Sequence, residues 1–207
     1  MRKRRTRGAL IYERMTAAAI LVLTLFLSPS TLRAGDFTEQ ELNRLLSDLY
    51  LKEGEKRVES GELPAGRFFL KESTEKNPLN ARAYNLAGIA EVRAGRMEAA
   101  EAYFTLATTS NPNCSECQQN LATVFLARGK PDLALMSFYR VLQDKKYPTP
   151  WLALYGSGMA YMKKRNYDLA VEMFGKVLKY VPAGLDEEIR AKINKAFYLK
   201  NIKEVKK

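Results

Sequence analysis

Apolar and small residues recur along this chain at a step of 34 residues. Each copy of the pattern has the spacing of two helices joined by a turn. The clearest copy spans 81–114, and its pattern is carried by Tyr84, Ala87, Gly88, Gly95, Ala100, Phe104, Ala107 and Pro112. Further copies span 115–148 and, after a two-residue insertion at Thr149 and Pro150, 151–184, and a degenerate copy spans 47–80. The sequence therefore predicts an all-α chain with about four consecutive helix–turn–helix units.

The recurring residue types suit the packing of such units. Alanine or glycine at the eighth and twentieth places lets two helices approach closely, and one phenylalanine per unit fills the space between neighbours. These phenylalanines are Phe104, Phe138 and Phe174. Glycine falls where the first helix must turn, at Gly95 and Gly129, and proline where the second helix must stop, at Pro78, Pro112 and Pro182. The repeats resemble tetratricopeptide repeats, and this resemblance implies a solenoid of stacked helix pairs.

A solenoid exposes its last face and usually needs a cap. The segment 185–204 has acidic residues at its start and lysines toward its end, which is the charge order that stabilises a helix. Its apolar residues at helical spacing are Ile189, Ile193, Ala196 and Phe197. We therefore expect 185–204 to form a capping helix that packs these four side chains against the final repeat.

The first 34 residues have the three-part pattern of a secretory signal. A basic stretch reaches Arg14, an apolar run covers 17–27, and small residues lead to Ala34. Cleavage after Ala34 is expected, although the uncharged stretch 15–32 also allows an uncleaved anchor in the inner membrane. Either way, the basic flank places the remaining chain outside the cytoplasm. Any membrane contact would be made only through this uncleaved segment.

Composition excludes several functional classes. The chain has no histidine and only two cysteines, so a zinc site, a histidine-based triad and a c-type haem attachment lack their ligands. We accordingly predict no catalytic residues, no metal, no cofactor and no enzymatic activity. The net charge of +11 includes a large share from the N-terminal signal, and the rest is not clustered as nucleic-acid binding requires. Nucleic acid is therefore not an expected partner.

The two cysteines, Cys114 and Cys117, are separated by two residues. Export would place them in an oxidising compartment, where a disulfide between them is expected to persist. The same spacing suits thiol exchange, which the start of a helix favours, but no thioredoxin-like strand pattern surrounds it. A structural disulfide and a thiol-active pair both remain open.

The tetratricopeptide resemblance also indicates where a partner would bind. In these repeats, the second, fifth, ninth, twelfth and thirteenth places of the first helix face an inner groove. The apolar stripe in this register consists of Val92, Leu126, Leu152, Tyr155, Met159 and Met162. Large adaptable side chains where a polar face is expected favour capture of an apolar helix or an extended peptide. The alternative is that the capping helix, or the superhelical turn of the repeats, buries this apolar stripe as core.

The residues at the junction before the last repeat indicate a narrower group among tetratricopeptide-repeat proteins. Tyr147 and Pro150 open the repeat with a two-residue insertion, and Ala153 and Gly158 follow. This arrangement resembles the type IV pilus biogenesis and stability family, the tetratricopeptide pilotins. The resemblance implies that the chain is a periplasmic protein whose partner is an outer-membrane secretin or another pilus component. The chain would help the secretin to reach its membrane or to assemble there.

The chain departs from the pilotin pattern in two places. It lacks the cysteine that the family lipidates after its signal, and it lacks the family's cysteine near Phe125, where Leu126 and Ala127 stand. The implied role is therefore that of an assembly factor without a lipid anchor. The rival functions are a generic interaction scaffold of the cell envelope and a thiol-active accessory protein that uses Cys114 and Cys117.

Overall fold

The structure is a computed structural model that describes residues 38–180 and 184–205, with side chains as far as residue 202. The predicted signal at 1–34 and Pro182 lie outside the described residues. The chain divides into two compact units, residues 1–42 and residues 43–207. In the first unit, Thr38 and Glu41 form a reciprocal cap: the Thr38 amide donates to Glu41 Oε2 at 2.8 Å, and the Glu41 amide donates to Thr38 Oγ1 at 3.2 Å.

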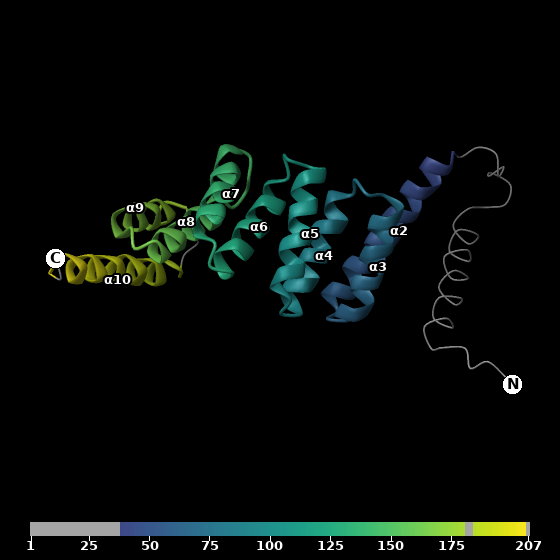
Figure 1. Ribbon diagram of the computed structural model, residues 1–207. Coiled ribbons are helices and arrows are strands. Elements are labelled where there is room, and N and C mark those ends of the chain that lie inside the picture. Colours follow the sequence, from purple (N-terminus) through teal and green to yellow (C-terminus); the bar gives the residue numbers. More distant parts are fainter. Residues whose placement is uncertain (1–37, 181–183, 206–207) are drawn as a thin grey trace, which may run out of the picture. The chain divides into compact units, whose positions relative to one another are not determined.

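The described residues form helices and no strands, which confirms the all-α prediction. The helices are α2 (Glu39–Glu59), α3 (Leu63–Lys76), α4 (Ala81–Arg93), α5 (Met97–Ser110), α6 (Ser115–Ala127), α7 (Pro131–Gln143), α8 (Pro150–Lys163), α9 (Tyr167–Val177) and α10 (Asp186–Val205). The pairs α4–α5, α6–α7 and α8–α9 pack closely, and each pair packs on the next through its second helix (Figure 1). Successive first helices α4, α6 and α8 also contact one another. This is the expected helical solenoid of repeats.

The glycines predicted to end the first helices lie at helix ends in the structure. Gly95 and Gly129 have φ values of 75° and 74°, in the left-handed region that favours glycine, and each follows the first helix of its repeat. In the last repeat the same turn is made by Arg165, with φ of 56°, which the glycine pattern did not indicate. Asparagine caps help to start two helices: Asn80 Oδ1 accepts from the Ala83 amide, and Asn166 Oδ1 from the Leu169 amide.

Each recurring phenylalanine is fully buried and lies against a glycine that leaves it room. The ring of Phe104 lies on Gly88 and that of Phe174 on Gly158, both within the same repeat. Phe138 instead lies on Gly156, in the first helix of the next repeat. The rings therefore pack the two helices of a repeat together as well as filling the junction to its neighbour.

Helix α10 packs against the last repeat, but one of the four side chains predicted to face that repeat does not. Ile189 and Ala196 are buried in the cluster around Phe174, and Ile193 packs against it half-buried. Phe197, which we expected to pack inward, is 48% exposed. The correction follows from helical geometry: once Ala196 faces the core, the next residue is rotated by about 100° around the axis.

Ion pairs recur between successive repeats. An acid in the first turn of a second helix meets a base at the end of the following first helix, in the pairs Glu98–Arg128, Asp132–Lys164 and Asp168–Lys200. The last pair includes α10, so α10 stands where the first helix of a further repeat would stand. Such exposed pairs each contribute about 0–1 kcal/mol.

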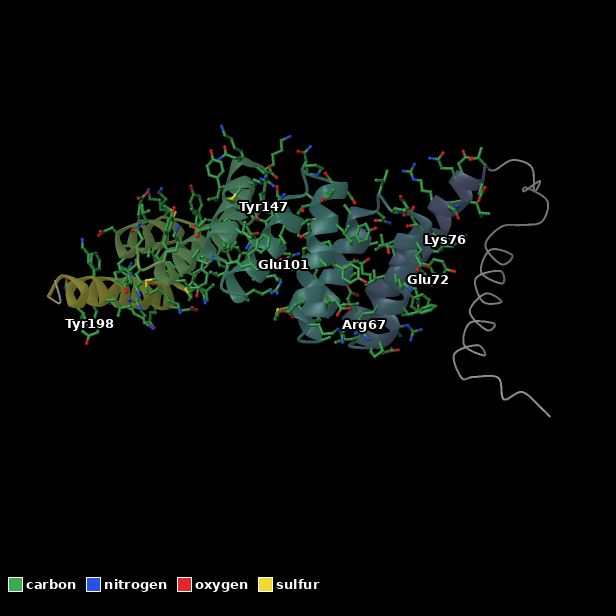
Figure 2. The ribbon with its side chains drawn as sticks, in the orientation of Figure 1. Arg67, Glu72, Lys76, Glu101, Tyr147 and Tyr198 are labelled. Carbon is green, nitrogen blue, oxygen red and sulfur yellow. A yellow bond between two sulfur atoms is a disulfide. The ribbon has the colours of Figure 1, made fainter. Side chains whose placement is uncertain are left out.

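A further ionic contact between successive repeats gives a testable pH dependence. Glu101 on α5 accepts hydrogen bonds from Lys130 Nζ at 2.8 Å and from Arg128 (Figure 2). Burial raises the pKa of Glu101, but the Lys130 and Arg128 hydrogen bonds outweigh it and lower the pKa below 4.5. Because the folded pKa is lowered, this stabilisation is present above pH 4.5 and disappears as the pH falls through the folded pKa.

We expect Glu101→Gln to lower the free energy of unfolding by about 0.5–1 kcal/mol near neutral pH, after allowance for solvent screening. The loss should diminish at an acid pH below the lowered pKa of Glu101, where the wild-type carboxylate is itself protonated. Urea denaturation at both pH values measures this difference. Glu172→Gln, in an exposed pair with Lys176 on α9, is the matched control and should change stability less. An equal loss at both pH values would contradict the ionic explanation.

Candidate functional site

The apolar stripe lies on α4, α6 and α8, and all six of its residues are half-buried. Val92 packs against the cluster that contains Phe104, and Leu126 packs against the cluster of Phe138. Tyr155, Met159 and Met162 pack against the cluster of Phe174, which also includes residues of α10. The apolar stripe thus contributes to the core on one side and keeps part of its surface open.

Tyr155 is fixed between the last repeat and α10. Its ring centroid lies 5.8 Å from that of Phe174, and its hydroxyl donates to Glu188 Oε1 at 3.0 Å. Burial raises the pKa of Tyr155 to about 12, and the hydrogen bond and charge of Glu188 add to the effect. The phenol therefore stays neutral at physiological pH and holds α8 to α10.

The N-terminal half of the predicted groove is polar. Asn85 Nδ2 donates to Glu116 Oε1 at 3.0 Å, and Asn120 Nδ2 donates to Asn85 Oδ1 at 2.9 Å. Arg82 binds Glu55 through both carboxylate oxygens, at 2.6 and 2.8 Å. These contacts join α2 to α4 and α4 to α6, and the sequence analysis had not predicted them.

Two of the hydrogen bonds between first helices occur at equivalent places of the repeats, so the alignment of the repeats could have predicted them. Asn85 of α4 and Tyr155 of α8 both stand at the fifth place of a repeat. Each bonds a glutamate in the first turn of the next helix but one, Glu116 of α6 and Glu188 of α10 respectively. Gln119 of α6 stands at the fifth place of the repeat between them. The place that corresponds to Glu116 is occupied on α8 by Leu152, which cannot accept a hydrogen bond from it. Gln119 is 9% exposed, and its Oε1 is buried with no hydrogen-bond partner among the described residues. The series of side-chain hydrogen bonds between first helices is therefore interrupted at Gln119, where the apolar half of the groove begins.

The cysteine pair lies at the start of α6. The Cys114 and Cys117 sulfurs are bonded to each other, and Cys114 caps the helix, its Sγ accepting from the Cys117 amide at 3.2 Å. The next residue, Ser115, donates to Asp144 Oδ2 at 2.6 Å and so ties α6 to the loop after α7. This hydrogen bond and the Lys146 amide lower the pKa of Asp144, which keeps it ionised.

A pocket of about 480 Å³ opens beside the disulfide. It is lined by Cys114, Ser115, Glu116, Asp144, Lys146, Tyr147, Pro148 and Thr149. Tyr147 belongs, with Pro150, Ala153 and Gly158, to the sequence element that resembles the pilotin family, and Figure 2 shows it at the loop that leads into α8. The other residues of that element have structural positions: Pro150 begins α8, Ala153 is fully buried, and Gly158 receives the ring of Phe174.

Two kinds of site are missing from the part of the chain that the structure describes. It contains no group of three or more acidic or cysteine side chains placed to hold a metal ion. None of its helices combines the length and the apolar character that crossing a membrane requires.

Comparison with family models agrees with the repeat register. Residues 51–114 and 152–183 each match a model of the tetratricopeptide repeat. These ranges cover the first two predicted repeats and the last one. The chain therefore contains tetratricopeptide repeats, and this fold presents surfaces that bind protein partners.

Several solved structures share the fold. PilF of Pseudomonas aeruginosa is 16% identical, with a TM-score of 0.67 over 77% of this chain and 71% of that chain. PilW, a type IV pilus biogenesis factor, is 17% identical, with a TM-score of 0.63 over 74% and 75% of the two chains. MamA is 17% identical, with a TM-score of 0.69 over 77% and 85%. A search of curated protein sequences found no match.

Proposed function

We propose that this tetratricopeptide-repeat protein is a scaffold of the bacterial cell envelope that aids assembly of the type IV pilus secretin. The observation that carries the binding role is the partly open apolar stripe, which interrupts a groove that is otherwise bridged by polar contacts. Val92, Leu126 and Leu152 would lie along a bound apolar helix or extended peptide, with the two methionines adapting to its shape.

The proposed location is the periplasm, with anchorage in the inner membrane as the alternative. It is supported by the basic and apolar signal pattern at 1–34 and by the bonded cysteine pair, because disulfides persist outside the cytoplasm. The pilus role is supported by Tyr147 and Pro150, which open the last repeat with the two-residue insertion, and by the likeness to PilF and PilW. MamA shares the fold equally well, so the second candidate is a generic interaction scaffold of the cell envelope.

Site-specific crosslinking in cells distinguishes these two candidates. A photo-reactive residue at Met159, which keeps part of its side chain open, is expected to capture a secretin subunit. Met136 on α7 is the matched control, since it is the same residue type and is 58% exposed on another helix. Capture of a different envelope protein at position 159 would favour the generic scaffold, and equal capture at both positions would contradict the groove.

A charge placed in the groove tests the same surface by affinity. Leu152 stands at the start of α8, and we expect Leu152→Glu to weaken secretin binding by about tenfold or more, because a carboxylate would then face an apolar segment of the partner. Leu133→Glu, on the 43% exposed Leu133 of α7, should leave binding unchanged. Calorimetric titration measures both, with circular dichroism to show that each variant remains folded.

The thiol-active accessory protein is tested by removing both sulfurs. Replacement of Cys114 and Cys117 together by serine should leave partner binding by the scaffold intact. Loss of every measurable function in this double variant, with the fold retained, would instead favour the thiol role.

A further inference from the structure

The two sulfurs of the disulfide have unequal access to solvent. Cys117 is fully buried in the first turn of α6. Cys114 is half-buried at the helix cap and lines the open pocket together with Tyr147 and Pro148. A disulfide that serves only to brace a turn needs neither a pocket on one sulfur nor burial of the other.

We infer that Cys114 and Cys117 form a thiol–disulfide exchange site that oxidises cysteine pairs of polypeptides entering this pocket. The inference rests on the geometry at the start of α6 and does not depend on the proposed pilus role. Cys114 is the sulfur that a substrate attacks, since Cys117 offers no approach from solvent.

The start of α6 suits Cys114 for this task. Its Sγ already accepts the Cys117 amide hydrogen at 3.2 Å, and it stands at the positive end of the helix dipole. Both interactions stabilise negative charge on Cys114 once the disulfide opens. A sulfur stabilised as a thiolate is also the better leaving group in exchange, so the product can be released.

The reaction balances without a further reagent. A substrate thiolate attacks Cys114 Sγ, a substrate–Cys114 bond forms, and the Cys114–Cys117 bond breaks, so that Cys117 Sγ receives the electron pair and a proton. The second thiolate of the substrate then attacks the substrate sulfur of this mixed disulfide and displaces Cys114 as a thiolate. The substrate loses two electrons and becomes a disulfide, and the cysteine pair gains the two electrons.

The charges around the pocket indicate which cysteines it prefers. Glu116 and Asp144 present two carboxylates, and Lys146 presents one ammonium group. Both Asp144 oxygens accept hydrogen bonds, from Ser115 and from the Lys146 amide, which fixes this carboxylate at the rim. The surplus of negative charge favours a substrate cysteine that is flanked by lysine or arginine.

Single-cysteine variants test the assignment of the two sulfurs. Cys117→Ala leaves Cys114 at the pocket, whereas Cys114→Ser leaves the buried Cys117 and keeps a good capping residue. With a neutral dipyridyl disulfide as probe, we expect Cys117→Ala to react more than about tenfold faster than Cys114→Ser. Equal rates in folded protein would overturn the assignment.

The wild-type chain tests the reaction itself without any substitution. The oxidised protein is mixed with a reduced peptide that has two cysteines flanked by lysines, and mass spectrometry follows both partners. We expect the peptide to gain its disulfide as the protein pair becomes reduced, and a peptide with glutamates in place of the lysines to react more slowly. If the protein pair stays oxidised with both peptides and with a glutathione buffer, the disulfide is structural only and the inference is wrong.

Discussion

Replacement of Phe174 by alanine is expected to lower the free energy of unfolding by about 3–5 kcal/mol. Phe174 is fully buried, and its ring joins α9 to Tyr155 of α8 and to the cluster that includes Ile189 of α10. Gly158 leaves space for this ring, so truncation creates a cavity at the centre of the last repeat. The loss would be a large share of the stability of an ordinary domain.

The loss should also be local. In a solenoid each repeat contacts only its neighbours, so weakening the last one loosens α8 to α10 before the remainder. Urea denaturation followed by circular dichroism measures the total change, and hydrogen exchange localises it. Tyr139→Ala, at a 65% exposed position on α7, is the matched aromatic control and should change stability by less than about 0.5 kcal/mol. Comparable losses in the two variants would show that Phe174 does not have this packing role.

The addition of one methyl group at Gly156 is expected to destabilise the junction between the third and fourth repeats. A Cβ there would lie 2.2 Å from Cζ of Phe138 and 2.7 Å from two further ring atoms. Phe138 is fully buried, so its ring cannot move toward solvent to relieve the clash. We expect Gly156→Ala to cost about 1–3 kcal/mol, even though alanine favours a helix more than glycine does.

The same substitution at Gly175 should have the opposite sign. Gly175 lies within α9, and no atom would come within 4 Å of an added Cβ. Gly175→Ala should therefore stabilise the chain by about 0.5–1 kcal/mol through helix propensity alone. Thermal and urea denaturation of the two variants, compared with wild type, measures both effects. A stabilising Gly156→Ala would mean that Phe138 is not confined as the structure describes.

Much of the scaffold could be predicted because its information is periodic. Small residues recur at the same places in the repeats, and a phenylalanine recurs in the last three of them, so each copy reinforces the prediction for the others. The exception at Arg165 shows the limit of this reasoning. The turn there has the same left-handed geometry as at Gly95, but a residue that gives no sequence signal adopts it.

The candidate site was predicted less completely than the scaffold. The register placed the apolar stripe on the first helices, but whether it is open or buried depends on how α10 rests against α8 and α9. The contacts of Asn85 with Glu116 and of Tyr155 with Glu188 join residues more than thirty positions apart. Side-chain pairing at that separation follows from the superposition of repeats and not from any local pattern.

By itself the sequence determined the helical repeats, their turns and the residues that fill their cores, because these depend on local propensity and on a repeated pattern of burial. Only the tertiary structure decided that Phe197 faces outward, that Gln119 lacks a polar bridge, and that Cys114 borders a pocket while Cys117 is buried. These features depend on the rotation and stacking of one helix against another. Those angles are set by the fit of side chains from several repeats together, which no single segment of the chain encodes.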